Sequence, residues 1–287
     1  HGGYCGDGTV NTAYGETCDP NALSSWNPNT EFCDSVNCQK GTKLRILQII
    51  PTSTNLDLAK LFTTTSDTYQ NNIIIQTATV TTTTLTHFNA SSTIYIPTSS
   101  PTLHYNALVF GFKDCNGNGD LTATSASTTE RFIQQGGGVI FGHDTFWKYT
   151  TTTLCGDHSN FNNLAPYAGI DVKNYSGSVS SFSFVKKNPS LNPNELMFTT
   201  PYTMTSTFYV TPTHNSGAIP SSTLCSTTGH SLLRVWYMKN DDNATDANFW
   251  AITCGRVEHI LLGHSTEAPY VNENKALINM LYYVATH

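Results

Sequence analysis

The sequence predicts an α/β domain, built on a mainly parallel sheet with flanking helices, and a small disulfide-stapled module in front of it. Three observations support this fold class. Short apolar segments alternate with segments whose apolar residues recur at helical spacing, which is typical of strands and crossover helices in a parallel sheet. Several of the apolar segments end abruptly at proline, glycine or a polar pair. Four of the eight cysteines lie within the first 38 residues, where apolar periodicity is almost absent.

The N-terminal module spans residues 1–42 and is rich in Cys, Gly, Asn and Asp. Its segments "CGDGTVNTAYGETCDPN" and "FCDSVNC" resemble the small Cys-rich CGDG repeat of extracellular and surface proteins. Four cysteines allow three pairings. We expect Cys5, Cys18, Cys33 and Cys38 to bond among themselves, because a unit this small cannot bury a core and depends on its disulfides.

The first half of the main domain, residues 43–287, alternates strands and helices. "LRILQII" predicts a buried strand ended by Pro51, and "STNLDLAKLF" predicts a helix with Ser53 or Thr54 as its N-cap. The β-branched "NNIIIQTATV" and the apolar "ALVFGF" predict two further strands. "SASTTERFIQQGGG" predicts a helix with a glycine stop, and "GVIFGHD" predicts the strand that follows it.

The second half of the domain contains an expanded, loop-rich middle at about residues 145–230. Within it, "SVSSFSFV" and "STFYVT" predict strands. "SLLRVWYMKN", "NFWAITC" and "VEHILLGHS" then predict three more strands, and "APYVNENKALINMLYYVA" predicts an amphipathic closing helix. We expect the four cysteines of the domain to pair as Cys115 with Cys155 and Cys225 with Cys254.

The strand, turn, strand and helix at the C-terminus, with "LLGHSTE" and "ALINMLYYVA", resemble the ThuA-like branch of the class I glutamine amidotransferase-like fold. The segment from "ALVFGF" to "GVIFGHD" is similar to the same family, and the resemblance covers about residues 43–287. It implies a flavodoxin-like α/β architecture. In true amidotransferases a cysteine nucleophile follows the strand equivalent to "GVIFG", and a histidine follows the last strand. Here the first turn carries His143 and Asp144 instead of cysteine, while His264 and Glu267 match the second position.

The missing thiolate excludes glutaminase activity, because a thiolate is what attacks the amide in that chemistry. His143, Asp144 and His264 each follow a strand, so we expect them to converge at the carboxyl edge of the sheet. Two imidazoles and a carboxylate are suited to binding a divalent metal or to acid–base catalysis. The alternative interpretation is a buried hydrogen-bonded cluster that ties loops together. The hydroxyls nearest to these residues are Thr145 and Ser265.

A second polar segment, "DCNGNGDLT", alternates oxygen-bearing side chains as in the first half of a calcium loop. The candidate ligands are Asp114, Asn116, Asn118 and Asp120. The twelfth position is Ser125, where such a loop needs a bidentate glutamate, so a disulfide-pinned polar turn is the alternative. Calcium is therefore the cofactor that this segment suggests, and the sequence establishes none.

Composition indicates where the protein works. The net charge is −6 with no basic cluster, which excludes nucleic acid as a partner. The apolar runs are too short to span a bilayer. Paired cysteines and three N-x-S/T sequons, at Asn89, Asn174 and Asn243, indicate a secreted or cell-surface glycoprotein.

Two functions follow as hypotheses. The first is a non-enzymatic subunit that assembles with copies of itself into an extracellular fibre or layer, which the missing nucleophile and the appended Cys-rich module favour. The second is a carbohydrate-active or metal-dependent hydrolase centred on His143, Asp144 and His264. Aromatic residues near the loops are suited to stacking on glycans in that case; they are Trp147, Tyr149, Phe161 and Tyr167.

Overall fold

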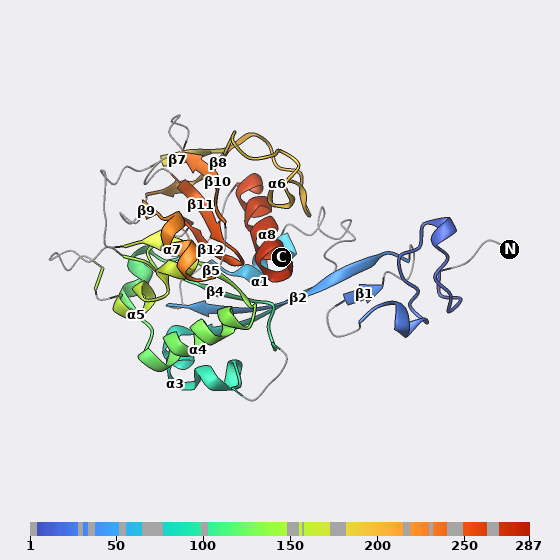
Figure 1. Ribbon diagram of the computed structural model, residues 1–287, viewed down its shortest axis with the longest axis horizontal. Helices are drawn as coiled ribbons and strands as arrows, with labels where there is room; N and C mark the ends of the chain where they lie inside the picture. The colour runs from blue at the N-terminus through green and yellow to red at the C-terminus, as the bar shows by residue number, and fades with distance from the viewer. Residues whose placement is uncertain are drawn as a thin grey trace.

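An eleven-residue strand, β2 (Lys40–Ile50), runs through both parts of the protein (Figure 1). Its first residues pair antiparallel with β1 (Glu31–Cys33), and its remaining residues pair in parallel with β3 (Thr77–Thr84) and β4 (Ala107–Phe110). The boundary expected after residue 42 thus falls inside a strand. The computed structural model describes residues 5–27, 31–33, 38–51, 56–64, 77–98, 103–147, 155–156, 158–172, 182–214, 219–229, 232–239, 249–262 and 270–287.

The predicted parallel sheet is confirmed in the order β3-β2-β4-β5-β12, where β5 spans Gly138–Phe141 and β12 spans Val257–Ile260. Every residue of β4 and β5 is buried. That explains why their sequences are continuous apolar runs, since strands of a parallel sheet are covered on both faces.

The sheet continues beyond β12 with four antiparallel strands, two of which come from the loop-rich middle. In spatial order they are β11 (Phe249–Cys254), β10 (Leu233–Lys239), β7 (Phe182–Lys187) and β8 (Thr207–Thr213). β6 (Ile170–Asp171) and β9 (Ile219–Pro220) form a separate two-stranded sheet. The α/β class is therefore confirmed, with an antiparallel half joined to the parallel one.

Helices cover both faces of the sheet. A Cβ on Gly138 would meet the Val284 carbonyl of α8 (Val271–Thr286), while one on the preceding Gly137 would meet the Phe132 ring of α4 (Ala123–Gln134). Because neighbouring residues of a strand point to opposite faces, α8 and α4 lie on opposite sides. Around α4 lie α3 (Leu85–Tyr95), α5 (Ser159–Asn162), η4 (Ala165–Ala168) and α7 (Ser222–Thr227); α6 (Leu196–Thr199) packs on α8.

Two helix starts differ from the sequence interpretation. α1 (Leu58–Thr64) begins after Asp57, whose carboxylate accepts the backbone N–H groups of Ala59 and Lys60. Asp57 is thus the cap, whereas Ser53 and Thr54 lie outside the described residues. The helix α3 was not predicted, because "LTHFNASSTIY" is polar and β-branched. It forms because the Thr84 hydroxyl accepts the N–H of residue 87 and because Phe88 is buried against the sheet.

All eight cysteines form disulfides, in the pairs expected for the domain: Cys115–Cys155 and Cys225–Cys254. The module is held by Cys5–Cys38 and Cys18–Cys33. Its centre is a polar group, since the buried Asp19 carboxylate accepts four backbone N–H groups, from Gly6, Gly8, Asn21 and Ala22. The module also carries η1 (Thr12–Tyr14) and η2 (Leu23–Ser25). Among the described residues, no helix combines the length and the apolar character that crossing a bilayer requires.

A buried carboxyl on α8 predicts a pH-dependent stability. Burial raises the pKa of Glu273 to about 7, even though its carboxylate accepts hydrogen bonds from the N–H and hydroxyl of Thr211. The unfolded chain loses this proton near pH 4.5 and the native chain near pH 7, so stability falls as the pH rises between these values. The loss reaches about 3 kcal/mol above pH 7, at 1.36 kcal/mol per pKa unit.

Glu273→Gln is expected to remove this contribution, because glutamine keeps the hydrogen bonds without a titrating proton. Urea unfolding at pH 4.5 should show nearly equal stability for parent and variant, and at pH 7.5 the variant should be the more stable protein. Equal stability at both pH values would contradict the assignment.

Candidate functional site

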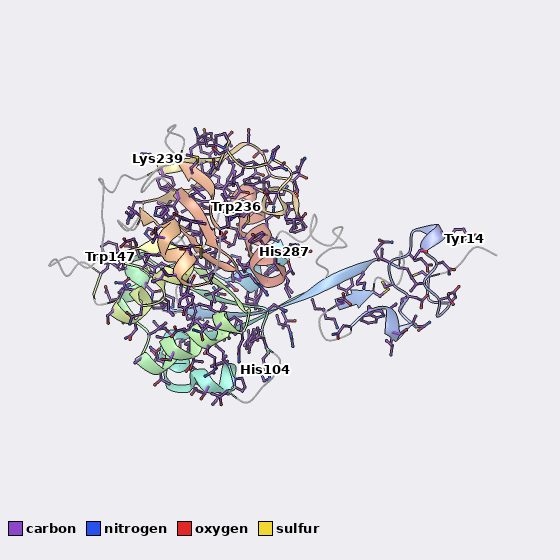
Figure 2. All side chains as sticks on the ribbon, viewed as in Figure 1. Tyr14, His104, Trp147, Trp236, Lys239 and His287 are labelled. Atoms are coloured by element: carbon purple, nitrogen blue, oxygen red, sulfur yellow. A yellow bond between two sulfur atoms is a disulfide. The ribbon has the colours of Figure 1, made fainter. Side chains whose placement is uncertain are left out.

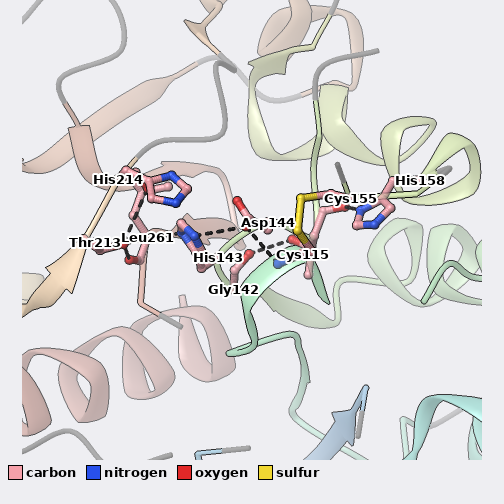
Figure 3. Close-up of polar contacts among 10 residues, drawn as sticks. Cys115, Gly142, His143, Asp144, Cys155, His158, Thr213, His214 and Leu261 are labelled. Atoms are coloured by element: carbon pink, nitrogen blue, oxygen red, sulfur yellow. Dashed lines mark hydrogen bonds and ion pairs between the residues drawn. A yellow bond between two sulfur atoms is a disulfide. The ribbon is translucent and has the colours of Figure 1, made fainter. Parts of the chain in front are cut away.

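The turn after β5 brings together the ends of three parallel strands (Figure 3). The N–H of Gly142 donates to the Phe110 carbonyl at the end of β4 (2.7 Å), and the N–H of His143 donates to the Leu262 carbonyl just after β12 (3.1 Å). Asp144 has a φ of 57°, in the left-handed region that non-glycine residues rarely adopt. His143 and Asp144 are thus at the carboxyl edge of the parallel sheet, as predicted.

The orientation of the buried His143 ring follows from its neighbours. Its Nδ1 lies 3.4 Å from the Thr213 hydroxyl, and that hydroxyl donates its own proton to the Leu261 carbonyl. A hydroxyl has a single proton to donate, so Nδ1 is assigned as the donor to Thr213. The other ring nitrogen, Nε2, lies 3.1 Å from Oδ2 of Asp144.

The Asp144 carboxylate is fully buried. Its Oδ2 also accepts the backbone N–H of Cys115 (2.9 Å), which the disulfide to Cys155 holds in place. Burial alone acts to raise the pKa of this carboxyl, but the His143 ring and the Cys115 N–H outweigh it and keep the pKa below its usual value. Its second oxygen, Oδ1, is buried without a hydrogen-bond partner among the described residues.

Two residues that the sequence analysis did not assign to this site complete the cluster. His214 directly follows β8, and its ring centroid lies 4.6 Å from that of His143. One ligand atom from each of Asp114, His143, Asp144 and His214 falls within 4.8 Å of the other three. Asp114 is exposed and His214 is half-buried, so the cluster reaches from the core to the surface. The signal that could have found His214 is the one used for His143, a polar residue directly after a strand.

The remaining predicted residues of the site have other surroundings or lie outside the described residues. His264, Ser265 and Glu267 belong to the latter group. The Thr145 hydroxyl donates to the Gly142 carbonyl (2.7 Å), so its proton is already engaged in the turn. The thiols nearest to the turn are oxidised in Cys115–Cys155. The described turn therefore offers no activated nucleophile of the amidotransferase type.

The predicted calcium ligands contact different parts of the chain in the structure. Asp114 belongs to the cluster with the two histidines. Asp120 accepts the N–H of Phe161 at Oδ1 and the N–H of Asn160 at Oδ2, which holds the start of α5. Asn116 donates to the carbonyl of residue 119 and lies in η3 (Asp114–Asn118). These contacts favour the polar, disulfide-pinned turn, and calcium binding stays a prediction.

Only some of the residues predicted to carry or to stack on sugar reach the surface among the described residues. The Asn89 amide lies on α3, donates to the Asp120 carbonyl and accepts the N–H of Thr122. A glycan there would have to fit beside these two bonds. Asn174, Asn243 and Tyr149 lie outside the described residues. Phe161 is fully buried, so its ring is not open to a sugar, whereas Trp147 and Tyr167 are half-buried.

No family model matches the chain, and no curated protein matches it. Solved structures that are similar to it include the following three. Two are described as ThuA-like proteins. The one from Bacteroides uniformis has 13% sequence identity, covers 84% of this chain and 90% of its own, and has a TM-score of 0.48. The one from Parabacteroides merdae has 12% sequence identity, covers 85% of this chain and 91% of its own, and has a TM-score of 0.46. The third is a cytoplasmic protein from Salmonella typhimurium LT2 with 14% identity over 84% and 99%, and a TM-score of 0.45. Because these identities are low and the TM-scores are below 0.5, the fold class is argued from the strand order observed in this chain.

Proposed function

We propose that this chain is a secreted, glycosylated structural subunit that assembles with copies of itself into an extracellular fibre or layer. The observation that carries the proposal is the position of the module. It stands away from the α/β domain on the projecting end of β2, as an arm (Figure 1). An arm on a larger body is suited to docking onto a neighbouring copy.

Exposed apolar side chains at both ends of the protein support this proposal. On the module, Tyr14 is 68% exposed and Leu23 is 63% exposed, and Figure 2 labels Tyr14 far from the domain. On the domain, Tyr209 is 60% exposed on β8, at the other end of the strand order from β1. A contact between two such unlike surfaces is head-to-tail, and it builds an open filament unless rotation closes it into a ring. Charged residues make up only 12% of the chain, which gives little repulsion between copies.

The proposed location rests on covalent chemistry. Four disulfides in one chain favour an oxidising compartment such as the extracellular space. The three sequons agree with passage through a secretory pathway.

Light scattering of the full chain across a concentration series is expected to show species larger than one copy. Tyr14→Ser should weaken association by about 30-fold, because a central aromatic anchor contributes on the order of 2 kcal/mol. Ile94→Ser is the matched control, since Ile94 is 72% exposed but lies on α3 in the domain. A parent protein that stays monomeric at millimolar concentration would refute the proposal.

A mixing experiment tests the head-to-tail arrangement. Tyr14→Ser copies keep an intact domain surface, and Tyr209→Ser copies keep an intact arm. If the arm docks onto the β8 edge, each variant alone should associate about 30-fold more weakly than the parent, and an equimolar mixture should stop at dimers. Assemblies larger than a dimer in the mixture would exclude the surfaces around Tyr14 and Tyr209 as the contacting pair.

A second candidate function is a carbohydrate-active or metal-dependent hydrolase using His143, Asp144 and His264. The observation that favours it is the backbone of Asp144, because left-handed non-glycine residues concentrate at functional sites. Hydrolysis of glycans or simple esters that is lost in Asp144→Asn but kept in Ile94→Ser would support it.

A further inference from the structure

We propose that Asp114, His143, Asp144 and His214 bind one divalent transition-metal ion of the zinc type. This site depends on neither proposed function, because a metal there serves equally to hold an assembly subunit together or to activate water. The inference uses four side chains from three separate parts of the chain, which Figure 3 shows in part around His143 and His214.

The spacing of the cluster is close to what a metal requires. Zinc–ligand bonds of about 2.0–2.1 Å in a tetrahedron place neighbouring ligand atoms about 3.3 Å apart. Nε2 of His143 and Oδ2 of Asp144 are already 3.1 Å apart, and all four ligand atoms fall within 4.8 Å. The remaining adjustment falls on Asp114 and His214, which are the two members of the cluster that are not fully buried.

The orientation of the His143 ring gives a second, geometric reason for a cation. Its Nδ1 faces the Thr213 hydroxyl, so Nε2 is aimed at the Asp144 carboxylate and lies 3.1 Å from Oδ2. A buried ring nitrogen and a buried carboxylate oxygen at this distance are held together by a proton or a metal ion between them.

The ligand set selects the class of metal. Calcium and magnesium prefer shells made of oxygen alone, whereas imidazole nitrogen suits zinc and its first-row neighbours. The surrounding contacts resemble those that orient metal ligands elsewhere. Thr213 fixes the tautomer of His143, and the N–H of Cys115 fixes the Asp144 carboxylate from the other side. Because Asp114 is exposed, an ion has a path into the site from solvent.

Isothermal titration of zinc chloride into the full chain, after removal of metal with a chelator, is expected to show one tight site per chain. His214→Gln and Asp114→Asn should each weaken the affinity by at least about 10-fold. Neither side chain is in the core, so both variants should keep the circular dichroism spectrum of the parent. His104→Gln is the control, because it removes an exposed histidine on another part of the domain and should leave the affinity unchanged.

Cobalt(II) provides a second readout that does not depend on heat of binding. Substitution by cobalt should give visible absorption bands of a four-coordinate nitrogen and oxygen site in the parent, and these bands should be lost in His214→Gln. The absence of a saturable site in the parent would overturn the proposal. Equal affinities for the His214→Gln and His104→Gln variants would also overturn it.

Discussion

Replacing Asn279 by alanine is expected to lower the free energy of unfolding by about 3–5 kcal/mol. Asn279 lies on the buried face of α8, and its side chain makes three hydrogen bonds to α6 and the residues that follow it. Its Oδ1 accepts the N–H of Tyr202 (2.9 Å), and its Nδ2 donates to the carbonyls of Tyr202 (2.7 Å) and Met197 (3.0 Å). Alanine would leave the N–H and the carbonyl of Tyr202 buried without these partners, and each such group costs about 1–3 kcal/mol. The Met197 carbonyl would keep only the longer hydrogen bond from the Tyr237 hydroxyl (3.4 Å).

Denaturant unfolding followed by circular dichroism measures this change. Asn272→Ala is the control on the same helix, because Asn272 is only half-buried near the first turn and should change stability by less than about 0.5 kcal/mol. If Asn279→Ala costs no more than Asn272→Ala, the side chain does not attach α8 to this segment.

Replacing Glu258 by methionine is expected to stabilise the protein at pH 7 by about 1–3 kcal/mol. Glu258 lies in β12 with no exposed surface, and neither carboxyl oxygen has a hydrogen-bond partner among the described residues. Burial holds its pKa well above the usual value. The native chain therefore keeps a proton that the unfolded chain releases near pH 4.5, and the cost of keeping it grows as the pH rises. Methionine has a similar volume without a polar group to desolvate.

Two control variants isolate the cause. Glu258→Gln keeps a buried polar group without partners, so it should gain less than methionine does. Ile140→Met replaces the cross-strand neighbour of Glu258 in β5 and should cost less than about 1.5 kcal/mol. Thermal unfolding of the three variants between pH 5 and 8 should show the Glu258→Met advantage increasing with pH. An advantage that does not change with pH would assign the effect to packing alone.

The parallel half of the fold could be predicted because it depends on local patterns. Buried parallel strands are short apolar runs, so "LRILQII", "ALVFGF" and "GVIFG" each indicated a strand that the structure contains as β2, β4 and β5. The helix α3 was missed because its sequence carries little apolar periodicity and its stability comes from a cap and from Phe88 packing on the sheet.

Part of the candidate site could likewise be predicted from the sequence, and part could not. A polar pair directly after an apolar strand was enough to place His143 and Asp144 at the carboxyl edge, because parallel strands end at one edge of a sheet. The sequence by itself also determined the fold class and the two cysteine pairs of the α/β domain. The tertiary structure alone decided that His214 and Asp114 belong to the same cluster. β8 joins the sheet through β10 and β7, and Asp114 approaches through a turn of left-handed residues, so neither contact leaves a periodic signal in the chain. Pairing between distant strands is a property of the assembled sheet, and that is why the ligand set becomes visible only in the folded protein.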